Sequence, residues 1–527
     1  MIACDVPPRA AFPFATFRSG QREALDAARE AFDAGARVVV IEAPTGAGKS
    51  ALGVTLARDA KSAYILTAQK ILQDQYGRDY PELALLKGRA TYGCEVGAAN
   101  AAAGPCISGW PCHLRDACDY FVARDDALAS GVALMNYAGF LHQIHDGGPF
   151  AARELLVLDE AHNAEAMLMA YLHVRIGDFE LERAGVEERL PAFIDPEYAI
   201  EIAEDLLPRL AARRVDLESS IARRATPTGS DLLKLQDLQW LAGQVRRLRW
   251  LVDSHGDGVE WVVETGRSDR GPFVSWKPVE VAPLADELLL GIGERVLMLS
   301  ATVLDAPTFL RSLGVDEDEA AVVRLPSTFP PERRPLVVRP SARLTRHHQE
   351  RELPKLAAAV IAILEDHDAE KGIVHTHSYR IARALVDALP RELRRRAITH
   401  YDAGGRQSAL EDHLTRPEPT VLVTPSMTEG LDLADDLARF QVICKIPYPY
   451  LGDPQVAARR ARDPHWYDWR TCLTLVQAYG RAVRSEDDHA VTYLLDADAP
   501  AFLARQAARL PPWFLEAVRT QERAATR

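Results

Sequence analysis

The sequence predicts an α/β protein with two parallel-sheet lobes and a helical segment inserted into the first lobe. Short apolar strands alternate with helical segments in both halves of the chain, which is the order of parallel sheets with crossover helices. A glycine-rich loop joins a strand to a helix at residues 43–50. The length of 527 residues is enough for three or four domains of ordinary size.

The first lobe is predicted from strands rich in Val, Ile and Leu, separated by stretches of helical periodicity. Strands are expected at residues 37–41, 63–67, 155–158 and 296–299. Helices are expected at residues 18–35, 51–59 and 69–75. The β-branched run that begins at residue 37 indicates a buried strand.

The rest of the chain predicts a helical insert, a hairpin and a second sheet. Residues 165–255 have helical periodicity, with many Leu and Arg residues and little strand character. Residues 259–277 are expected to form a short hairpin. After three prolines between residues 330 and 335 the α/β pattern returns. Strands are expected there at residues 372–375, 421–424, 441–444 and 490–495.

The composition is that of a globular protein and excludes several classes. Hydrophobic residues make up 47% and charged residues 26%, which excludes a mainly disordered chain and a fibrous rod. The 62 Lys and Arg against 75 Asp and Glu give a net charge of −13, which excludes a strongly basic nucleic-acid coat protein. A nucleic-acid enzyme with a local basic groove stays open, because binding depends on how charge is distributed.

No segment predicts a membrane span or a secretory signal. Residues 127–145 are a long stretch of the first third without Asp, Glu, Lys or Arg, and they include several polar side chains. Asp5 and Arg9 interrupt any apolar core at the N-terminus. We expect a cytoplasmic protein with no membrane contact. We also expect no extra N-terminal domain, because only about 42 residues precede the glycine-rich loop.

Residues 43–50, Ala-Pro-Thr-Gly-Ala-Gly-Lys-Ser, match the phosphate-loop variant A-x-T-G-x-G-K-[ST]. The backbone N–H groups of such a loop bind phosphates at a helix N-terminus. Lys49 is expected to place its charge on those phosphates, and Ser50 to bind Mg²⁺. The alternative is a glycine-rich turn with an unrelated lysine. The expected nucleotide-binding residues of the loop are Thr45, Gly46, Ala47, Gly48, Lys49 and Ser50.

Asp159 and Glu160 directly follow the apolar strand at residues 155–158. A carboxylate at a strand end can hold Mg²⁺, and the next carboxylate can activate water for attack on a phosphate. An Asp-Glu pair after a strand is a weak signal by itself. About a hundred residues after a phosphate loop, the pair predicts the metal-binding and catalytic carboxylates of a nucleotide hydrolase.

Residues 477–484 fit the pattern Q-x-x-G-R-x-x-R, with Arg481 and Arg484 on one helix face. Arginines from a second lobe can stabilise charge on a transferring phosphoryl group. The alternative is a solvated basic helix face. Residues 300–302, Ser-Ala-Thr, follow a predicted strand and by themselves indicate only a turn.

Four of the seven cysteines, Cys94, Cys106, Cys112 and Cys118, fall within 25 residues. In a reducing compartment such a group indicates metal binding or catalysis rather than disulfides. Structural zinc sites usually contain closely spaced C-x₂₋₄-C pairs, and this stretch has none. The spacing therefore favours an iron–sulfur cluster over zinc, with thiols that bind no metal as the third alternative.

Together these motifs resemble helicase superfamily 2, and more closely its XPD/DinG iron–sulfur group. The resemblance extends over nearly the whole chain and includes residues 67–75, 159–162, 300–302, 429–432 and 477–484. It implies two RecA-like lobes that clamp ATP between them while DNA runs across both. Residues 87–94 resemble the lead-in to the first ligand of a [4Fe–4S] cluster, and Asn136-Tyr137 resembles the Asn-Tyr pair that follows the cluster domain.

The resemblance also implies a role for each matching residue. Gln21 resembles a glutamine that reads adenine through its amide, although a surface helix start is the alternative. Asp432 and Gln477 belong to motifs beside the nucleotide on the second lobe. The implied catalytic residues are Lys49, Asp159, Glu160, Arg481 and Arg484. The implied metal ligands are Ser50 and Asp159 for Mg²⁺, and Cys94, Cys106, Cys112 and Cys118 for [4Fe–4S].

The implied domain order places both insertions in the first lobe. The expected ranges are 1–87, 123–164 and 281–330 for the first RecA-like lobe, 88–122 for the cluster domain, 165–280 for a mainly helical Arch-like domain, and 331–527 for the second RecA-like lobe. The family encloses single-stranded DNA with its Arch and cluster domains. The insert carries eight arginines suited to phosphate contact, although a solvated helix face is the better expectation for any one of them.

The resemblance predicts an ATP- and Mg²⁺-dependent DNA helicase that moves 5′→3′ along single-stranded DNA and unwinds forked or tailed duplexes. We expect it to be a monomer. Two alternatives stay open: a DNA-dependent ATPase that translocates or remodels without unwinding, and a non-catalytic nucleic-acid-binding scaffold. Against the scaffold, the chain retains Lys49, Asp159, Glu160 and Arg484.

Overall fold

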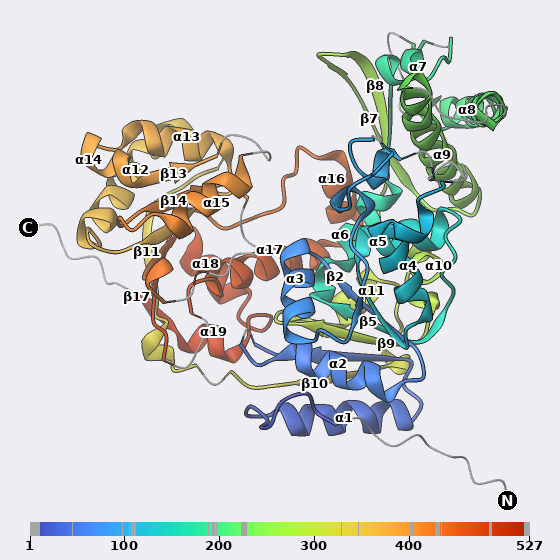
Figure 1. Cartoon of the computed structure of the whole chain (residues 1–527). Helices are drawn as coiled ribbons and strands as arrows, with labels where there is room; N and C mark the ends of the chain where they lie inside the picture. Colours follow the sequence, from blue (N-terminus) through green and yellow to red (C-terminus); the bar gives the residue numbers. More distant parts are fainter. Residues whose placement is uncertain are drawn as a thin grey trace, which may run out of the picture.

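The computed structural model describes residues 11–520, apart from residues 45, 97, 105, 107–111, 188, 192–194, 196–197, 223–228, 328, 346, 401–404, 427–432, 434 and 484–486. The described chain forms two seven-stranded parallel sheets and one three-stranded antiparallel sheet. Figure 1 shows the two large sheets as adjacent lobes, with two long helices beyond the first lobe. The predicted fold class of two parallel-sheet lobes is confirmed.

The first sheet has the strand order β10-β1-β9-β5-β2-β4-β3. Its strands are β1 (Val38–Glu42), β2 (Ala63–Thr67), β3 (Ala84–Leu85), β4 (Val132–Asn136), β5 (Arg153–Asp159), β9 (Gly293–Ser300) and β10 (Ala320–Arg324). All four predicted strands lie in this sheet, whereas β3, β4 and β10 were not predicted. Val38 and Val40 face one apolar core and Val39 and Ile41 face the other. β1 is apolar throughout because both faces of the sheet are covered.

Helices cover both faces of the first sheet. Its helices are α1 (Gln21–Asp33), α2 (Lys49–Asp59), α3 (Lys70–Asp79), α4 (Asp119–Ala129), α5 (Tyr137–His145), α6 (Ala164–Leu172), α10 (Ala282–Leu288) and α11 (Ala306–Ser312). α1 and α2 pack in the core that contains Ile41, while α5 and α6 pack in the opposite core. The segment with the four clustered cysteines lies between β3 and α4 and includes the short helices η1 (Arg89–Thr91), η2 (Ala101–Ala103) and η4 (Arg115–Ala117).

The larger insert combines two long helices with the small sheet. Its elements are β6 (Val174–Gly177), α7 (Asp178–Arg183), α8 (Ala199–Ala222), α9 (Gly229–Gly256), β7 (Trp261–Ser268) and β8 (Gly271–Pro278). The predicted hairpin is β7–β8, and β6 pairs with the other edge of β8. β6 was not predicted, because so short a segment becomes a strand only through its distant partner. None of the described helices is long and apolar enough to cross a membrane.

The second sheet has the strand order β13-β14-β12-β15-β16-β11-β17. Its strands are β11 (Leu336–Ala342), β12 (Gly372–His375), β13 (Ala397–Thr399), β14 (Val421–Thr424), β15 (Phe440–Ile443), β16 (Val491–Asp496) and β17 (Val518–Thr520). Its helices are α12 (Gln349–Asp366), α13 (Tyr379–Ala388), α14 (Arg391–Arg396), α15 (Arg406–Thr415), α16 (Pro454–Arg462), α17 (Pro464–Tyr479), α18 (Ala499–Arg505) and α19 (Pro512–Glu516). The four predicted strands correspond to β12, β14, β15 and β16, each within one residue.

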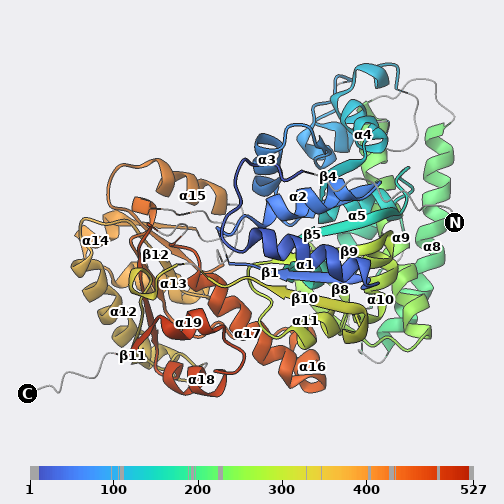
Figure 2. The ribbon, with the colours of Figure 1, turned by 90° about the horizontal axis from the view of Figure 1, so that it is seen from below.

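The topology brings three predicted motifs to one edge of the first sheet. β9 lies between β1 and β5 and is parallel to both. The carboxyl ends of these three strands lead into residues 43–50, 159–162 and 300–302. In open parallel sheets, loops at this edge form the ligand site. α17 lies between the two lobes in both views (Figures 1 and 2).

Candidate active site

The phosphate loop leaves β1 and enters α2 at the carboxyl edge of the first sheet. Gly46 (φ 82°) and Gly48 (φ 77°) have left-handed backbone conformations, which glycine adopts without steric cost. A Cβ on Gly48 would collide with Nε2 of Gln21. α2 begins at Lys49. The first N–H groups of a helix have no partner within it, so this end of α2 suits a phosphate.

Gln21 is buried against the loop, and both atoms of its amide are bonded within the chain. Its Nε2 donates to the carbonyls of Ala47 (2.8 Å) and Gly48 (3.2 Å). Its Oε1 accepts the backbone N–H of Arg18 at 2.7 Å. The Arg18 guanidinium also donates to the carbonyl of Gly46. In this structure Gln21 therefore holds the loop, and an adenine would have to compete with these bonds.

The Lys49 ammonium connects the loop with the carboxylates that follow β5. Its Nζ lies 3.5 Å from the carbonyl of Ala43 and 3.9 Å from Oε1 of Glu160. The Lys49 side chain is 11% exposed, so solvent screens this charge pair only weakly. Burial raises the pKa of the nearby Tyr80 phenol, and the adjacent Ser50 side chain opposes this rise.

Asp159 ends β5, and its carboxyl group is buried. Oδ2 accepts the hydroxyl of Tyr76 at 2.9 Å, and Oδ1 accepts the backbone N–H of Glu160 at 2.9 Å. Burial, followed by the charge of Glu160, raises the pKa of Asp159 to about 6, while Lys49 and the two hydrogen bonds oppose the rise. Sequence reasoning missed Tyr76, because nothing in the helical pattern of α3 distinguishes it from a core tyrosine.

Glu160 has a strained backbone. Its φ of 49° and ψ of 49° place a non-glycine residue in the left-handed region, at a cost of roughly 1–2 kcal/mol. The turn directs the chain from β5 into the short helix η5 (Ala161–Asn163) and leaves the Glu160 side chain 27% exposed at the cleft. Strain of this kind persists where the surrounding structure enforces it, and it is common at active sites.

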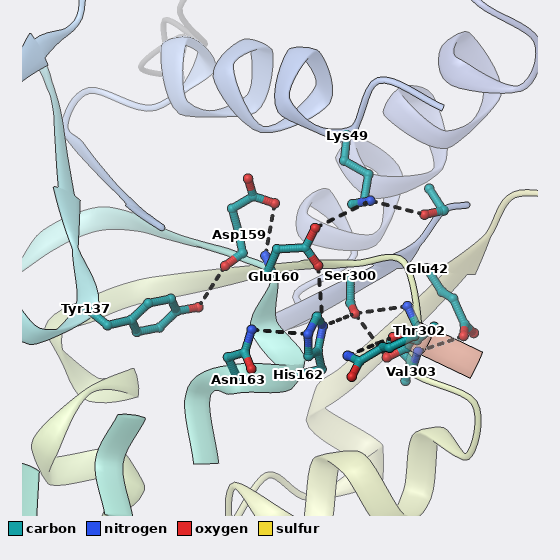
Figure 3. A network of polar contacts seen from close by, with 12 residues as sticks. Glu42, Lys49, Tyr137, Asp159, Glu160, His162, Asn163, Ser300, Thr302 and Val303 are labelled. Atoms are coloured by element: carbon teal, nitrogen blue, oxygen red, sulfur yellow. Dashed lines mark hydrogen bonds and ion pairs between the residues drawn. The ribbon is translucent and has the colours of Figure 1, made fainter. Parts of the chain in front are cut away.

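A polar network joins the carboxylates to the Ser-Ala-Thr segment (Figure 3). Nδ1 of His162 lies 2.9 Å from Oγ of Ser300 and 3.4 Å from Oε2 of Glu160. The Asn163 amide lies 3.1 Å from Nε2 of the same ring. The Ser300 Oγ also accepts the backbone N–H of Thr302 at 3.1 Å. Residues 300–302, which the sequence pattern alone left as a turn, therefore connect to the Glu160 carboxylate through one buried histidine.

The second lobe contributes the opposite wall of the site. A cleft of about 780 Å³, open to solvent, is lined by Glu160 and Thr302 from the first lobe and by Gln477 and Arg481 from the second. The Gln477 amide donates to Oγ1 of Thr302 at 3.4 Å. Arg481 donates from Nε to the carbonyl of Gln477 at 3.0 Å. The predicted residues Thr45, Asp432 and Arg484 lie outside the described residues.

Two of the four clustered cysteines, Cys94 and Cys106, lie beside Gly104. The sulfurs of Cys94 and Cys106 both lie within 3.5 Å of the position that a Cβ would take on Gly104. Burial raises the pKa of the Cys106 thiol, and the neighbouring thiols of Cys112, Cys118 and Cys94 raise it further. Among the described residues, no three His, Cys, Asp or Glu side chains are grouped closely enough to hold a single metal ion.

Comparison with known proteins agrees with this arrangement. Residues 14–180 match the family model of the type III restriction enzyme res subunit, and residues 361–514 match that of the helicase C-terminal domain. The ATP-dependent DNA helicase YoaA of Escherichia coli (strain K12) is 24% identical over 607 residues and is covered to 91%, as is this chain.

Solved structures share the fold over nearly the whole chain. An XPD helicase has a TM-score of 0.63 at 14% identity, and the match covers 96% of this chain and 100% of that one. Both family models, YoaA and the shared fold support an ATP-dependent DNA helicase that is similar to the XPD/DinG type of superfamily 2. Xpd4 of S. tokodaii has a TM-score of 0.57 at 16% identity, with the same coverage as the XPD helicase. In this helicase the two matched family models fall in different lobes.

Proposed function

We propose that this helicase hydrolyses ATP in the cleft between its lobes, moves 5′→3′ along single-stranded DNA and separates duplex strands. The observation that carries the proposal is the composition of the cleft. Glu160 and Thr302 at the edge of the first sheet meet Gln477 and Arg481 from the second lobe. A γ-phosphate bound there would contact both lobes, so hydrolysis would change how the lobes attract each other.

Each side chain of the cleft has a proposed role in phosphoryl transfer. Lys49 would neutralise the β- and γ-phosphates, and Glu160 would orient and deprotonate the attacking water. Arg481 and Arg484 would stabilise the charge that develops in the transition state. Asp432 and Gln477 would contact the nucleotide from the second lobe. We propose that Gln21 acts mainly by fixing the loop, since its amide already bonds the loop carbonyls.

The proposed ligands of Mg²⁺ are the Ser50 hydroxyl and the Asp159 carboxylate. Oxygen ligands of this kind suit the ion, and the nearby positive charge would favour the ionised form of Asp159. When bound, Mg²⁺ supplies positive charge to the phosphate oxygens. The carboxylate of Asp159 is oriented by two hydrogen bonds. The Tyr76 hydroxyl donates to one of its oxygens, and the Glu160 N–H donates to the other.

The four clustered cysteines are the proposed ligands of a [4Fe–4S] cluster. Cys94 and Cys106 lie beside one glycine, the thiols of Cys112 and Cys118 are near enough to raise the pKa of Cys106, and thiolates are the usual ligands of such clusters. The spacing of the four cysteines, which contains no C-x₂₋₄-C pair, favours such a cluster over zinc. When bound, the cluster supplies folding energy to a segment with few apolar side chains.

The proposed partners are single-stranded DNA and forked or tailed duplexes. A group of basic side chains lies where the cysteine segment meets the large insert. Arg247, Arg246 and Arg89 all lower the pKa of His142, after the larger effect of burial. The common direction of these effects indicates that positive charge gathers at this junction, despite the net charge of −13. Such a group suits the phosphates of a passing strand.

The test is ATP hydrolysis by anaerobically purified protein, with and without single-stranded DNA, followed by strand displacement on duplexes with a 5′ or a 3′ tail. We expect DNA-stimulated hydrolysis and displacement of the 5′-tailed duplex only. Hydrolysis without displacement would favour a translocase or remodeller. Absence of hydrolysis with retained DNA binding would favour a non-catalytic scaffold. Displacement of the 3′-tailed duplex alone would contradict the proposed polarity.

A further inference from the structure

Helix α17 belongs to two hydrophobic cores. Its N-terminal residues Trp466, Trp469 and Leu473 pack in the main core of the first lobe, although the helix lies in the second half of the sequence. Its C-terminal residues Val476 and Tyr479 pack in a core of the second lobe. Figure 2 shows the helix passing from one lobe to the other. One rigid element therefore connects the interiors of both lobes.

Three side chains at the N-terminal half of α17 donate hydrogen bonds to the first lobe. The indole N–H of Trp466 donates to Oε2 of Glu165 at 3.0 Å. The indole N–H of Trp469 donates to the carbonyl of Val303 at 2.8 Å. Arg470 donates to the carbonyl of His162 at 3.4 Å. Val303 directly follows the Ser-Ala-Thr segment, His162 lies within the motif at residues 159–162, and Glu165 lies three residues after that motif.

The Glu165–Trp466 contact is deeply buried. Glu165 is 7% exposed and Trp466 is 6% exposed. Burial raises the pKa of Glu165, whereas Arg470, the Trp466 hydrogen bond and Arg459 lower it. A buried carboxylate without its hydrogen-bond donor destabilises the folded state. Trp466 is therefore held where its indole N–H can reach Glu165.

The residues that link Trp466 to the cleft lie along one face of α17. Trp466, Arg470, Leu473 and Gln477 follow one another at four, three and four residues, which places them on one face of the helix. Eleven residues correspond to about three turns, or roughly 16 Å along the axis. The end that bonds Glu165 and the end that bonds Thr302 therefore face the first lobe together.

Helix α16, which precedes α17, is attached to the same side. The Gln455 amide donates to the carbonyl of Val279 at 2.7 Å. The buried Arg459 pairs with Glu280, which also pairs with Arg462 at 2.9 Å. The end of the large insert thus holds α16, the first lobe holds the start of α17, and α17 enters the second lobe at its C-terminal end.

We propose that Glu165 and Trp466 are a positioning pair for ATP hydrolysis: their hydrogen bond sets the axial position of α17, and thereby the approach of Gln477 and Arg481 to the cleft. The inference rests on the proposed ATPase function. Neither residue touches the nucleotide. Because Lys49 and the phosphate loop are unaffected by the pair, its loss slows turnover while ATP binding stays close to normal.

The experiment measures ATP turnover, the KM for ATP and thermal stability for four variants. Trp466→Phe keeps the ring and removes the indole N–H; we expect turnover to fall about tenfold, with KM within about twofold of the parent. The turnover of Glu165→Leu should fall by a similar factor. The turnover of the double variant should be no lower than that of either single variant. Glu165→Gln keeps an acceptor oxygen and should retain more than about half of the turnover.

Trp261→Phe is the matched control. Trp261 is also buried and donates its indole N–H to a side chain, the hydroxyl of Ser254 at 3.0 Å, but it lies in the large insert. Turnover without DNA should stay at the parent level in this variant. The loss of thermal stability in Trp261→Phe measures how much a missing indole hydrogen bond destabilises the fold when the active site is not involved.

Three results would overturn the positioning role: normal turnover of Trp466→Phe, a rise in KM with unchanged turnover, or additive losses in the double variant. Failure of the proposed function would look different, since the parent protein itself would then hydrolyse no ATP. A parent that hydrolyses ATP, with a normal Trp466→Phe variant, would refute the positioning pair alone.

Discussion

The carboxylate of Glu42 holds the backbone of Val303. The Val303 N–H donates to Oε1 of Glu42 at 2.7 Å, and the next N–H, that of Leu304, donates to the same oxygen at 2.8 Å. Arg324 donates to the second oxygen at 2.9 Å. Glu42 is the last residue of β1, and Val303 directly follows the Ser-Ala-Thr segment. One side chain therefore ties the entrance of the phosphate loop to the segment that faces the second lobe.

Glu42→Ala should destabilise the first lobe and slow ATP turnover, because two backbone N–H groups lose a charged acceptor. We expect the free energy of unfolding to fall by about 2–4 kcal/mol, measured in urea. The control is Glu42→Gln, whose amide oxygen can still accept both bonds. The free energy of unfolding of Glu42→Gln should fall by less than half as much as that of Glu42→Ala. Equal losses in the two variants would show that the backbone contact is not the cause.

Lys49→Ala should abolish ATP hydrolysis and leave binding of single-stranded DNA measurable. The ammonium lies beside Glu160 at the nucleotide edge, whereas the proposed DNA contacts lie at the junction of the cysteine segment and the insert. Turnover and fluorescence anisotropy of a labelled oligonucleotide are the two measurements. Lys61→Ala, at an exposed lysine of the same lobe, should hydrolyse ATP normally. Near-parental turnover of Lys49→Ala would refute the role of the loop.

The second lobe should lose stability as the pH falls below about 6.5. Burial lowers the pKa of His413 to about 4, and its ring contacts the carbonyl of Leu437 and the hydroxyl of Thr420, both at 2.9 Å. The unfolded chain takes up a proton near pH 6.5 and the folded chain only near pH 4. Stability is therefore complete above about pH 6.5 and falls by up to about 3 kcal/mol towards pH 4.

Melting temperatures between pH 8 and pH 4 test this expectation. The melting temperature of His413→Gln should be lower than that of the parent at pH 8, but it should fall less between pH 8 and pH 4. His347→Asn, at an exposed histidine, should follow the parent at every pH. A His413→Gln variant whose melting temperature falls as steeply as that of the parent would place the acid-sensitive group elsewhere.

Cys112→Ser should lower the iron and sulfide content of anaerobically purified protein from about four of each per chain, and should bleach its brown colour. Strand displacement should suffer more than ATP hydrolysis, because the cysteine segment lies apart from the residues of the cleft. The control, Cys472→Ala, removes a buried thiol of α17 and should leave the iron content unchanged. One zinc ion and no iron in the parent would overturn the cluster assignment.

Local sequence pattern predicted eight of the fourteen described strands of the two large sheets and most of the motif residues. Continuous apolar runs of four or five residues marked the central strands, since a strand buried on both faces leaves no polar alternation. Edge strands such as β3 and β13 escaped prediction, because runs of two or three residues carry no pattern of their own. β6 is similar: it is a strand only because β8 pairs with it.

The chemical residue types of the site were determined by the sequence itself. The phosphate-binding role is predicted by a lysine that follows glycines at a strand–helix junction. The metal-binding role is predicted by two carboxylates after a second strand. Neither prediction needs knowledge of distant contacts. The meeting of these residues also follows from sequence, since parallel strands place their carboxyl ends at one edge.

What only the tertiary structure decided is which ordinary-looking side chains hold those residues in place. Glu42, Tyr76, Glu165 and Trp466 carry no sequence signal, because each stands at a position compatible with an ordinary helix or strand. Their partners lie far away along the chain, up to 301 residues for Glu165 and Trp466. Packing of the lobes brings such pairs together, and a buried polar group must then be satisfied by whatever donor or acceptor the fold places beside it.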